Sequence, residues 1–248
     1  MDLPKLYIGT SGWHYQHWIG PFYPKNLEKK ERLNYYSQYF STVEINHSFY
    51  KLPDQGTFQN WVEQVPGNFT FSVKASRYIT HMKKLKDTSE ALSRFMNGIK
   101  PLKRNQGPIL FQLPPHWKCN IERLESFLEI LPFEGQYVFE FRDSSWWNNE
   151  TYKLLKQNKA AFCIFDLAGV LSPIISTTNF VYIRLHGPND AYKGSYSEEA
   201  LNKWAERIQK WITKDKMVFC YFDNDQNAFA SKNALQLEQI LQSYPKNK

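Results

Sequence analysis

Eight short apolar runs are spread along this chain of 248 residues, and each run ends on a polar or charged residue. They are Leu6–Thr10, Thr42–Asn46, Phe69–Lys74, Ile109–Gln112, Tyr137–Arg142, Ala161–Asp166, Phe180–His186 and Met217–Tyr221. Their lengths are typical of β-strands. Most of the intervals between them carry apolar residues at helical spacing. Eight strands alternating with helices predict an α/β fold, in which residues 1–248 form a single (β/α)8 TIM-barrel domain.

The helices are predicted from the spacing of apolar residues between the runs. They cover Lys29–Phe40, Thr57–Val65, Thr88–Leu102, Asn120–Leu131, Thr151–Gln157, Ser197–Ile212 and Asn227–Leu241. Asn120 is placed to cap the start of its helix. Between the sixth and seventh strands only Leu167–Asn179 is available, and Pro173 interrupts it. Because proline breaks helices, we expect the barrel to be irregular at this point.

Several features of the sequence bear on its cellular location. No run of 18 or more uncharged apolar residues occurs, which argues against a membrane-spanning helix. The first strand begins too close to Met1 to leave room for a signal peptide. Cys119, Cys163 and Cys220 lack the CxxC spacing of redox or metal motifs, and this usage is typical of a reducing compartment. We therefore expect a cytoplasmic protein without a membrane partner.

Side chains alternate along a strand, so the two faces of each run can be separated by parity. In most runs one parity is apolar and the other ends on a polar group that is predicted to face the barrel interior. The inward set is Glu44, Asn46, Lys74, Gln112, Glu140, Arg142, Asp166, Arg184 and His186. The last run is ambiguous in parity, although its exit, Asp223–Asp225, is polar. Because strand C-termini build the active sites of barrels, we expect the functional site here.

Motifs along nearly the whole chain point to a known family. The first reads IGTSGWHYQHW from Ile8 and is followed by GPFYP, and later ones read QLPP from Gln112 and RLHG from Arg184. Together they resemble the YecE-like family, a widespread domain of unknown function. The resemblance implies a (β/α)8 barrel and no established reaction. At Ala228 the family often has glycine, so the backbone of this loop can adopt fewer conformations than is usual in that family.

The inward residues suggest acid–base chemistry on an anion. Glu140, Asp166 or Glu44 is predicted to act as acid or base, with His186 as proton carrier. Lys74, Arg142, Arg184 and His81 are predicted to bind an anionic group. Further predicted substrate contacts are Asn46, Gln112, Tyr15, Tyr50, Trp146, Asn224 and Asp225. We expect an enzyme with a small substrate that is phosphate-bearing or derived from nucleic acid, its reaction class being open.

Two other interpretations of the inward charges stay open. They can form structural ion pairs, such as Glu44 or Glu140 with Arg142, and Asp166 with Arg184, although buried pairs are costly to desolvate. Alternatively, the barrel is a non-catalytic interaction module.

No cofactor is predicted, but a metal ion is an alternative. Glu140, Asp166, His186 and Asp225 lie at the ends of four successive strands, as the ligands of a divalent metal in a phosphodiesterase would. Arg142 and Arg184 would compete for the same carboxylates. No glycine-rich nucleotide-binding loop occurs in the sequence.

The net charge of +7 is concentrated in one segment. Nine basic residues face only two acidic ones, Asp87 and Glu90, between Lys74 and Arg104. Such a local excess is typical of proteins that bind nucleic acid, and Arg77, Lys83, Lys84 and Lys86 are placed to make such contacts. The competing interpretation is a solvated helix face.

Overall fold

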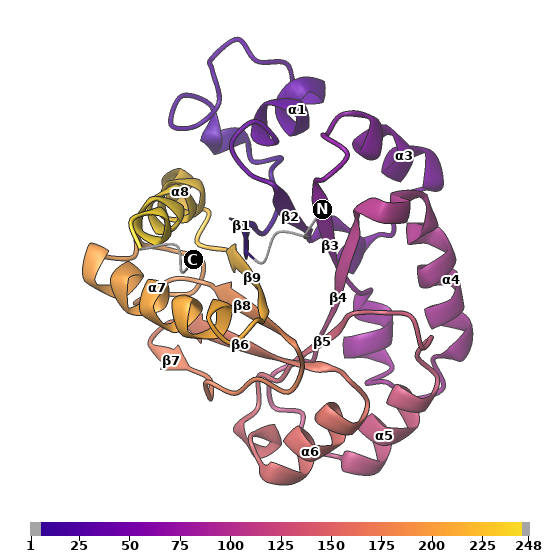
Figure 1. Cartoon of the computed structure of the whole chain (residues 1–248). Coiled ribbons are helices and arrows are strands. Elements are labelled where there is room, and N and C mark those ends of the chain that lie inside the picture. The colour runs from indigo at the N-terminus through magenta and orange to yellow at the C-terminus, as the bar shows by residue number, and fades with distance from the viewer. Residues whose placement is uncertain (1–5, 245–248) are drawn as a thin grey trace. The chain divides into compact units, whose positions relative to one another are not determined.

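The computed structural model describes residues 6–244 and has an α/β fold of the (β/α)8 type (Figure 1). Each of the eight predicted runs forms a strand. The strands are β1 (Leu6–Thr10), β2 (Thr42–Ile45), β3 (Thr70–Lys74), β4 (Gln106–Gln112), β5 (Tyr137–Glu140), β6 (Ala161–Leu167), β8 (Phe180–Leu185) and β9 (Met217–Phe222), with a two-residue β7 (Val170–Leu171). The strand order is β1-β9-β8-β6-β5-β4-β3-β2, and β7 pairs with β6. The prediction of a TIM-barrel-like fold is confirmed.

Each predicted helical region contains a helix, and one short helix, α2 (His47–Tyr50), lies outside those regions. The others are α1 (Arg32–Tyr36), α3 (Gln55–Glu63), α4 (Ser89–Ile99), α5 (Ile121–Glu129), α6 (Asn149–Gln157), α7 (Glu198–Ile212) and α8 (Phe229–Gln242). The Asn120 side chain accepts the N–H of Arg123, which confirms its predicted capping role. Over residues 6–244, no helix is both long enough and apolar enough to cross a membrane.

The helix predicted over Lys29–Phe40 is wrong in extent. Lys29–Glu31 forms a 3-10 turn, and the α-helix occupies only Arg32–Tyr36. At its end the Ser37 hydroxyl donates to the carbonyl of Asn34. Such local side-chain bonds compete with helix propagation, which accounts for the early stop.

The chain divides into two compact units. The first contains the residues up to Val43, Ile164–Ile174 and the residues from Asn179 onward. The second contains Glu44–Cys163 and Ile175–Thr178. The single domain expected from the sequence therefore stays a prediction, and each unit is described by itself.

In the first unit, β1, β9 and β8 run parallel in continuous register, with Ile8 opposite Cys220 and Ile183 opposite the same residue. Helices α7 and α8 pack side by side and cover these strands (Figure 1). The buried residues of α7 recur at helical spacing and form its core-facing stripe. They are Leu201, Trp204, Ala205 and Ile208.

A tyrosine hydroxyl joins β1 to β2 in this unit. Tyr36 is fully buried, and its hydroxyl accepts the N–H of Thr10 at 2.9 Å and donates to the carbonyl of Thr42 at 3.1 Å. Gly9 allows the close approach, because a Cβ there would lie 2.3 Å from the Thr42 carbonyl oxygen. The side chain thus takes the place that a main-chain bond would fill.

In the second unit, β3, β4 and β5 pair in parallel, and β5 pairs with the start of β6. The centre of β4 is buried on both faces, as expected of a strand between a core and covering helices. Helix α4 contributes the buried Leu92, Phe95 and Ile99. Gln112, the last residue of β4, lies in register with Glu140, the last residue of β5.

No helix follows β6, which confirms the irregularity predicted there. Instead β7 folds back antiparallel, with Leu171 opposite Asp166. The Ser172 hydroxyl accepts the N–H of Phe165 at 2.8 Å and fixes the returning chain. A side-chain acceptor such as this hydroxyl satisfies the hydrogen bonding of a main-chain N–H group in the strand.

Candidate functional site

The ends of β8 and β9 bring a buried charge cluster together in the first unit. Leu185 lies in register with Phe222, so the next residues, His186 and Asp223, are adjacent. Arg184 and His186 are two residues apart and share a face of the strand. We call Ser11, Arg184, His186 and Asp223 the Arg184 cluster.

Hydrogen bonds orient every member of this cluster. Oδ2 of Asp223 lies 2.9 Å from Nδ1 of His186 and 3.2 Å from Nη2 of Arg184. Nη1 of Arg184 lies 3.3 Å from Nε2 of His186, and Nη2 donates to the hydroxyl of Ser11. Arginine only donates, so Nε2 of His186 accepts and its Nδ1–H donates to Asp223. With both ring nitrogens engaged and no exposed surface, His186 is placed to orient Asp223.

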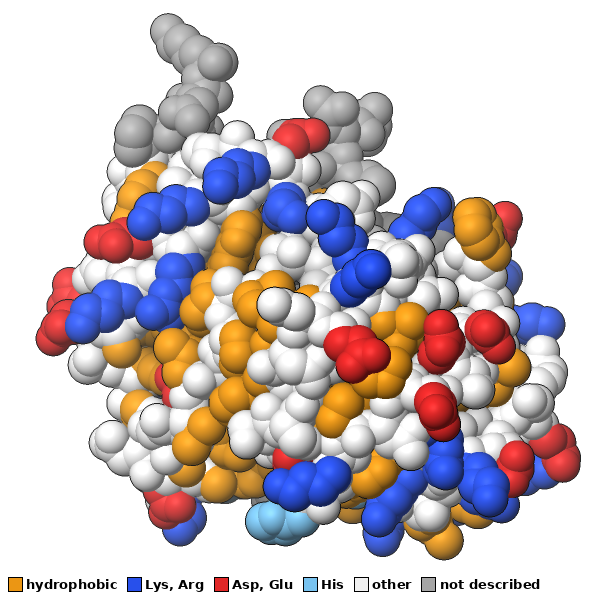
Figure 2. All heavy atoms as spheres, turned by 90° about the horizontal axis from the view of Figure 1, so that it is seen from below, with side chains coloured by type: hydrophobic (Ala, Val, Ile, Leu, Met, Phe, Trp, Pro, Cys, Tyr) orange, Lys and Arg blue, Asp and Glu red, His pale blue; other side chains and the backbone are white. Residues whose placement is uncertain are grey.

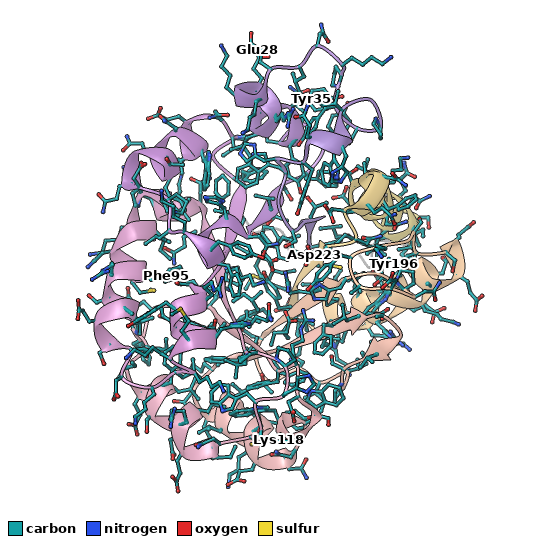
Figure 3. All side chains as sticks on the ribbon, turned by 180° about the vertical axis from the view of Figure 1, so that it is seen from behind. Glu28, Tyr35, Phe95, Lys118, Tyr196 and Asp223 are labelled. Carbon is teal, nitrogen blue, oxygen red and sulfur yellow. The ribbon has the colours of Figure 1, made fainter. Side chains whose placement is uncertain are left out.

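Asp166 does not pair with Arg184, contrary to the ion pair considered from the sequence. Its carboxylate accepts the hydroxyl of Tyr196, which in turn accepts the N–H of Gly187 at 3.1 Å. Arg184 pairs with Asp223 instead, across the register of β8 with β9. The Tyr196 ring contacts Phe222, the residue before Asp223, and Figure 3 labels Tyr196 and Asp223.

Among the described residues of the first unit, three half-buried carboxyl groups have raised pKa values: Asp166, Asp225 and Glu238, whose pKa burial raises to about 7. Burial raises the pKa of Asp166, although the nearby His186 and the Tyr196 hydroxyl oppose the shift. Burial also raises the pKa of Asp225, and the charge of Asp223 adds to this effect. Asp166 and Asp225 both take up protons more readily than an ordinary aspartate, which is the property expected of a general acid.

The first loop packs against Asp225. Nε1 of Trp18 donates to the Asp225 carbonyl at 3.1 Å, and the ring of His17 lies 3.5 Å from the Asp225 carboxylate. Tyr15 packs on Trp18 and donates its hydroxyl to the Ser11 carbonyl. The expected substrate contact Tyr15 is therefore part of the packed loop next to the Arg184 cluster.

Asn224 is fully buried, and its amide orientation is fixed. Nδ2 donates to the Gly194 carbonyl at 2.8 Å and to Oδ1 of Asn233 at 3.0 Å. Over residues 6–244, Oδ1 of Asn224 has no hydrogen-bond donor. Leaving a buried oxygen without a donor costs free energy.

A second cluster forms in the second unit around His81, at the ends of β3 and β5. We call Lys74, Arg77, His81, Glu140 and Arg142 the His81 cluster. Nζ of Lys74 lies 4.3 Å from the centre of the Phe49 ring, and that ring meets His81 edge-on. Glu140 is fully buried and forms an ion pair with Arg142, as considered from the sequence.

The environment of His81 is strongly positive. Burial, followed by the charges of Lys74, Arg77 and Arg142, lowers its pKa from the ordinary 6.5 to about 4, with only Glu140 opposing the shift. Its Nδ1 lies 2.9 Å from the hydroxyl of Thr80. His81 is therefore neutral at physiological pH within a group of cations, an arrangement that favours an anionic ligand.

The other predicted residues of the second unit differ in accessibility. Glu44 is fully buried at the end of β2, Gln112 is nearly so, and Asn46 is half-buried. Tyr50 is 71% exposed. Trp146 is fully buried, stacks on Phe141, and donates its Nε1–H to the Trp117 carbonyl. The expected ligand role of Trp146 does not fit this packing, because no face of its ring is accessible.

The basic segment is mostly solvent-exposed. Arg77, Lys84 and Lys86 are exposed, and Lys83 is half-buried beside the ring of Tyr78. On the face shown in Figure 2, basic and acidic side chains are interspersed with hydrophobic ones and form no continuous basic surface. Binding of nucleic acid by this segment stays a prediction.

The residues suggested as metal ligands do not assemble. Within the described range, no group of three or more His, Cys, Asp or Glu side chains is arranged to hold a metal ion. Glu140 is engaged by Arg142, and His186 is engaged by Arg184 and Asp223. The donor set thus fits ion pairing better than coordination of a metal.

Two central residues were not predicted from the sequence. The sequence does not single out Asp223, because the parity of the last run is ambiguous. Its position directly after that run does place it at the polar exit of the strand. Tyr196 lies in a loop outside any strand pattern, and nothing in its spacing points to Asp166. Both are identified only by the register of β8 with β9 and by the loop that precedes α7.

Comparisons with known proteins agree with this architecture. Residues 7–248 match the model of a family described as protein of unknown function DUF72. The curated UPF0759 protein YunF of Bacillus subtilis is 26% identical, over 95% of this chain and 94% of its own length. A crystal structure of a DUF72 family protein from Thermotoga maritima is 31% identical, with a TM-score of 0.89 over 97% of this chain and 100% of that one. A DUF72 family structure from Enterococcus faecalis, 21% identical over 98% of this chain and 99% of that one, shares the fold with a TM-score of 0.83.

Proposed function

The chain belongs to the DUF72 family, whose function is unknown, and on this premise we propose that it is an enzyme acting on a small anionic, phosphate-bearing substrate by acid–base chemistry. The observation that carries the proposal is the His81 cluster. Lys74 and His81 both contact the Phe49 ring, the charges of Lys74, Arg77 and Arg142 lower the pKa of His81, and Glu140, which is paired with Arg142, opposes them.

The cationic excess supports an anionic ligand. An anion is attracted to a place where several cationic side chains gather, whatever other partners those side chains have. Lys74 and Arg142 supply an ammonium and a guanidinium, which are the usual partners of phosphate oxygens. His81 stays neutral near pH 7 and can donate or accept a hydrogen bond beside them.

Glu140 and Glu44 supply the acid–base part of the proposal within the second unit, which holds the His81 cluster. We assign Glu140 as the leading general acid or base, because it is the carboxylate of that cluster and its ion pair with Arg142 orients it. Asn46 and Gln112 are proposed as further contacts to the substrate. In the first unit, considered by itself, Asp166 and Asp225 have raised pKa values, and His186 positions Asp223.

Binding of inorganic phosphate tests the anion site. Calorimetry on the purified protein is expected to detect phosphate binding, and Arg77→Met is expected to weaken it by about tenfold or more, since a bond to a charged group is lost. Lys86→Met is the matched control, because Lys86 is an exposed cation of the same basic segment outside the cluster. Equal phosphate affinity in both variants would contradict the assignment.

Turnover tests the acid–base assignment. A panel of phosphate monoesters and diesters is expected to yield at least one hydrolysed compound, and Glu140→Gln, shown to be folded by circular dichroism, is expected to abolish turnover while phosphate binding is retained. Phosphate binding without turnover of any compound by the unaltered protein would favour a non-catalytic binding module.

Nucleic acid is the second candidate ligand, favoured by the exposure of Lys84 and Lys86. Binding through phosphate contacts weakens steeply as salt increases. Labelled single-stranded and double-stranded oligonucleotides should therefore bind at low salt and dissociate at higher salt. The Lys84→Met/Lys86→Met double variant should bind them more weakly, and an unchanged affinity would exclude this surface.

A further inference from the structure

A cavity of about 350 Å³ lies in the second unit, against the segment that connects β3 to α4. Its volume is within the range of small-molecule sites, roughly 300–1,000 Å³. Leu52, Ile79, Ala91 and Phe95 give it an apolar lining, and Ile79 and Phe95 are buried. The members of the Arg184 and His81 clusters do not line it. The cavity is therefore distinct from both clusters.

The charged lining of this cavity is balanced. Lys83 and Arg94 contribute two cations, and Asp87 and Glu90 contribute two carboxylates. Arg94 and Glu90 already pair with each other across one turn of α4, at 3.1 Å. Lys83 and Asp87 are the remaining opposite charges, so the cavity offers one positive and one negative group over an apolar floor.

The backbone beside the cavity is held in an uncommon conformation. Lys84, Leu85 and Asp87 have φ angles of 47°, 65° and 48°, in the left-handed region that non-glycine residues rarely adopt. The preceding Tyr78–Met82 forms a π-helical turn. Such turns and strained residues cluster at binding sites, where they hold side chains in fixed positions.

We propose that this cavity binds a free α-amino acid with an apolar side chain. The carboxylate of the ligand would face Lys83, its ammonium would face Asp87, and its side chain would contact Ile79 and Phe95. A phosphate or other dianion fits poorly, because the charges of the lining balance and Asp87 faces the same cavity as Lys83. An uncharged apolar ligand would leave Lys83 and Asp87 without a role in recognition.

The test is calorimetry of the whole protein with leucine, phenylalanine and glycine. Leucine and phenylalanine are expected to bind about tenfold or more tightly than glycine, because their side chains are buried in the cavity. Phenylalaninamide lacks the carboxylate and resembles a peptide N-terminus. N-acetylphenylalanine lacks the ammonium and resembles a peptide C-terminus. Both blocked compounds are expected to bind at least tenfold more weakly, since each lacks one charge-assisted contact.

Matched variants locate the site. Lys83→Met and Asp87→Asn should each reduce leucine affinity, and Ala91→Trp should abolish binding by filling the cavity. Lys84→Met is the control, because Lys84 shares the loop and the left-handed conformation but does not line the cavity. The proposal is overturned if no amino acid binds, if a blocked compound binds as tightly as phenylalanine, or if Ala91→Trp, shown to be folded by circular dichroism, binds leucine normally. Phosphate binding at the His81 cluster is measured separately, so failure here leaves that proposal standing.

Discussion

Oδ2 of Asp223 lies 2.9 Å from Nδ1 of His186, and the same oxygen accepts a bond from Arg184. One carboxylate oxygen therefore holds two buried donors from the neighbouring strand. The pairing follows from the parallel register of β8 and β9, which places residues 186 and 223 side by side after Leu185 and Phe222.

Asp223→Asn is expected to destabilise the protein by about 3 kcal/mol or more, because Arg184 is left buried without its compensating charge. Urea denaturation measures the change. The control is Asp190→Asn, which removes an exposed ion pair with Lys193 and should change the free energy of unfolding much less. Similar losses for the two variants would show that Asp223 does not hold the cluster.

Tyr36→Phe is expected to lower the free energy of unfolding by about 1–3 kcal/mol, because the buried N–H of Thr10 and carbonyl of Thr42 lose their shared partner. Tyr35→Phe serves as control, since its hydroxyl bonds only the exposed Tyr39 hydroxyl and should matter little. Hydrogen exchange at the Thr10 amide should accelerate in the first variant alone. An unchanged exchange rate would contradict the bridging role.

The pH dependence of stability should carry a contribution from His81. Its pKa in the folded protein is about 4, below the ordinary value of 6.5, so between these values the unfolded chain binds more protons. The free energy of unfolding should therefore decrease as the pH falls from 6.5 to 4. The stability that depends on neutral His81 is fully present only above pH 6.5. Denaturation of His81→Gln across the same range should show a shallower decrease. A steeper or identical slope would argue against the cationic environment.

Arg32 is a buried cation with incomplete pairing. Its side chain is 3% exposed, Nη2 bonds the Gln16 amide oxygen, and Nε and Nη1 have no hydrogen-bond partner among residues 6–244. Replacing a poorly compensated buried charge by an apolar residue of similar length is often neutral or stabilising, by about 1–4 kcal/mol. Arg32→Met is therefore expected to match or exceed the original melting temperature. Arg32→Lys keeps the charge without the contact to Gln16 and should melt lower.

The strands and most helices could be predicted from the sequence because their apolar spacing is local. The ion pair of Glu140 with Arg142 was also accessible, since two residues of equal parity at one strand end are neighbours. The ion pair of Asp166 with Arg184, considered from the sequence as an example of structural pairing, is not the one that forms. Parity assigns a residue to a face of its strand but not to a partner on another strand, which is set by the packing of the whole sheet.

Aromatic residues at the strand ends show a second limit of the sequence. Trp146 and Tyr50 both follow strand motifs, yet one is fully buried and the other is 71% exposed. Composition alone gives the two rings similar chances of binding a ligand. The exposure of each ring depends on its neighbours in the folded protein. Phe141 and Trp117 pack against Trp146, and these contacts form only when the loops are folded.

The hydroxyl that links Thr10 to Thr42 also has an evolutionary consequence. Main-chain ladder bonds are available to almost any sequence, so drift in side chains rarely deletes them. The link between the first and second strands is instead encoded at a single codon, and one base change from tyrosine to phenylalanine removes it. A single substitution can therefore remove this link while both strands keep their sequences.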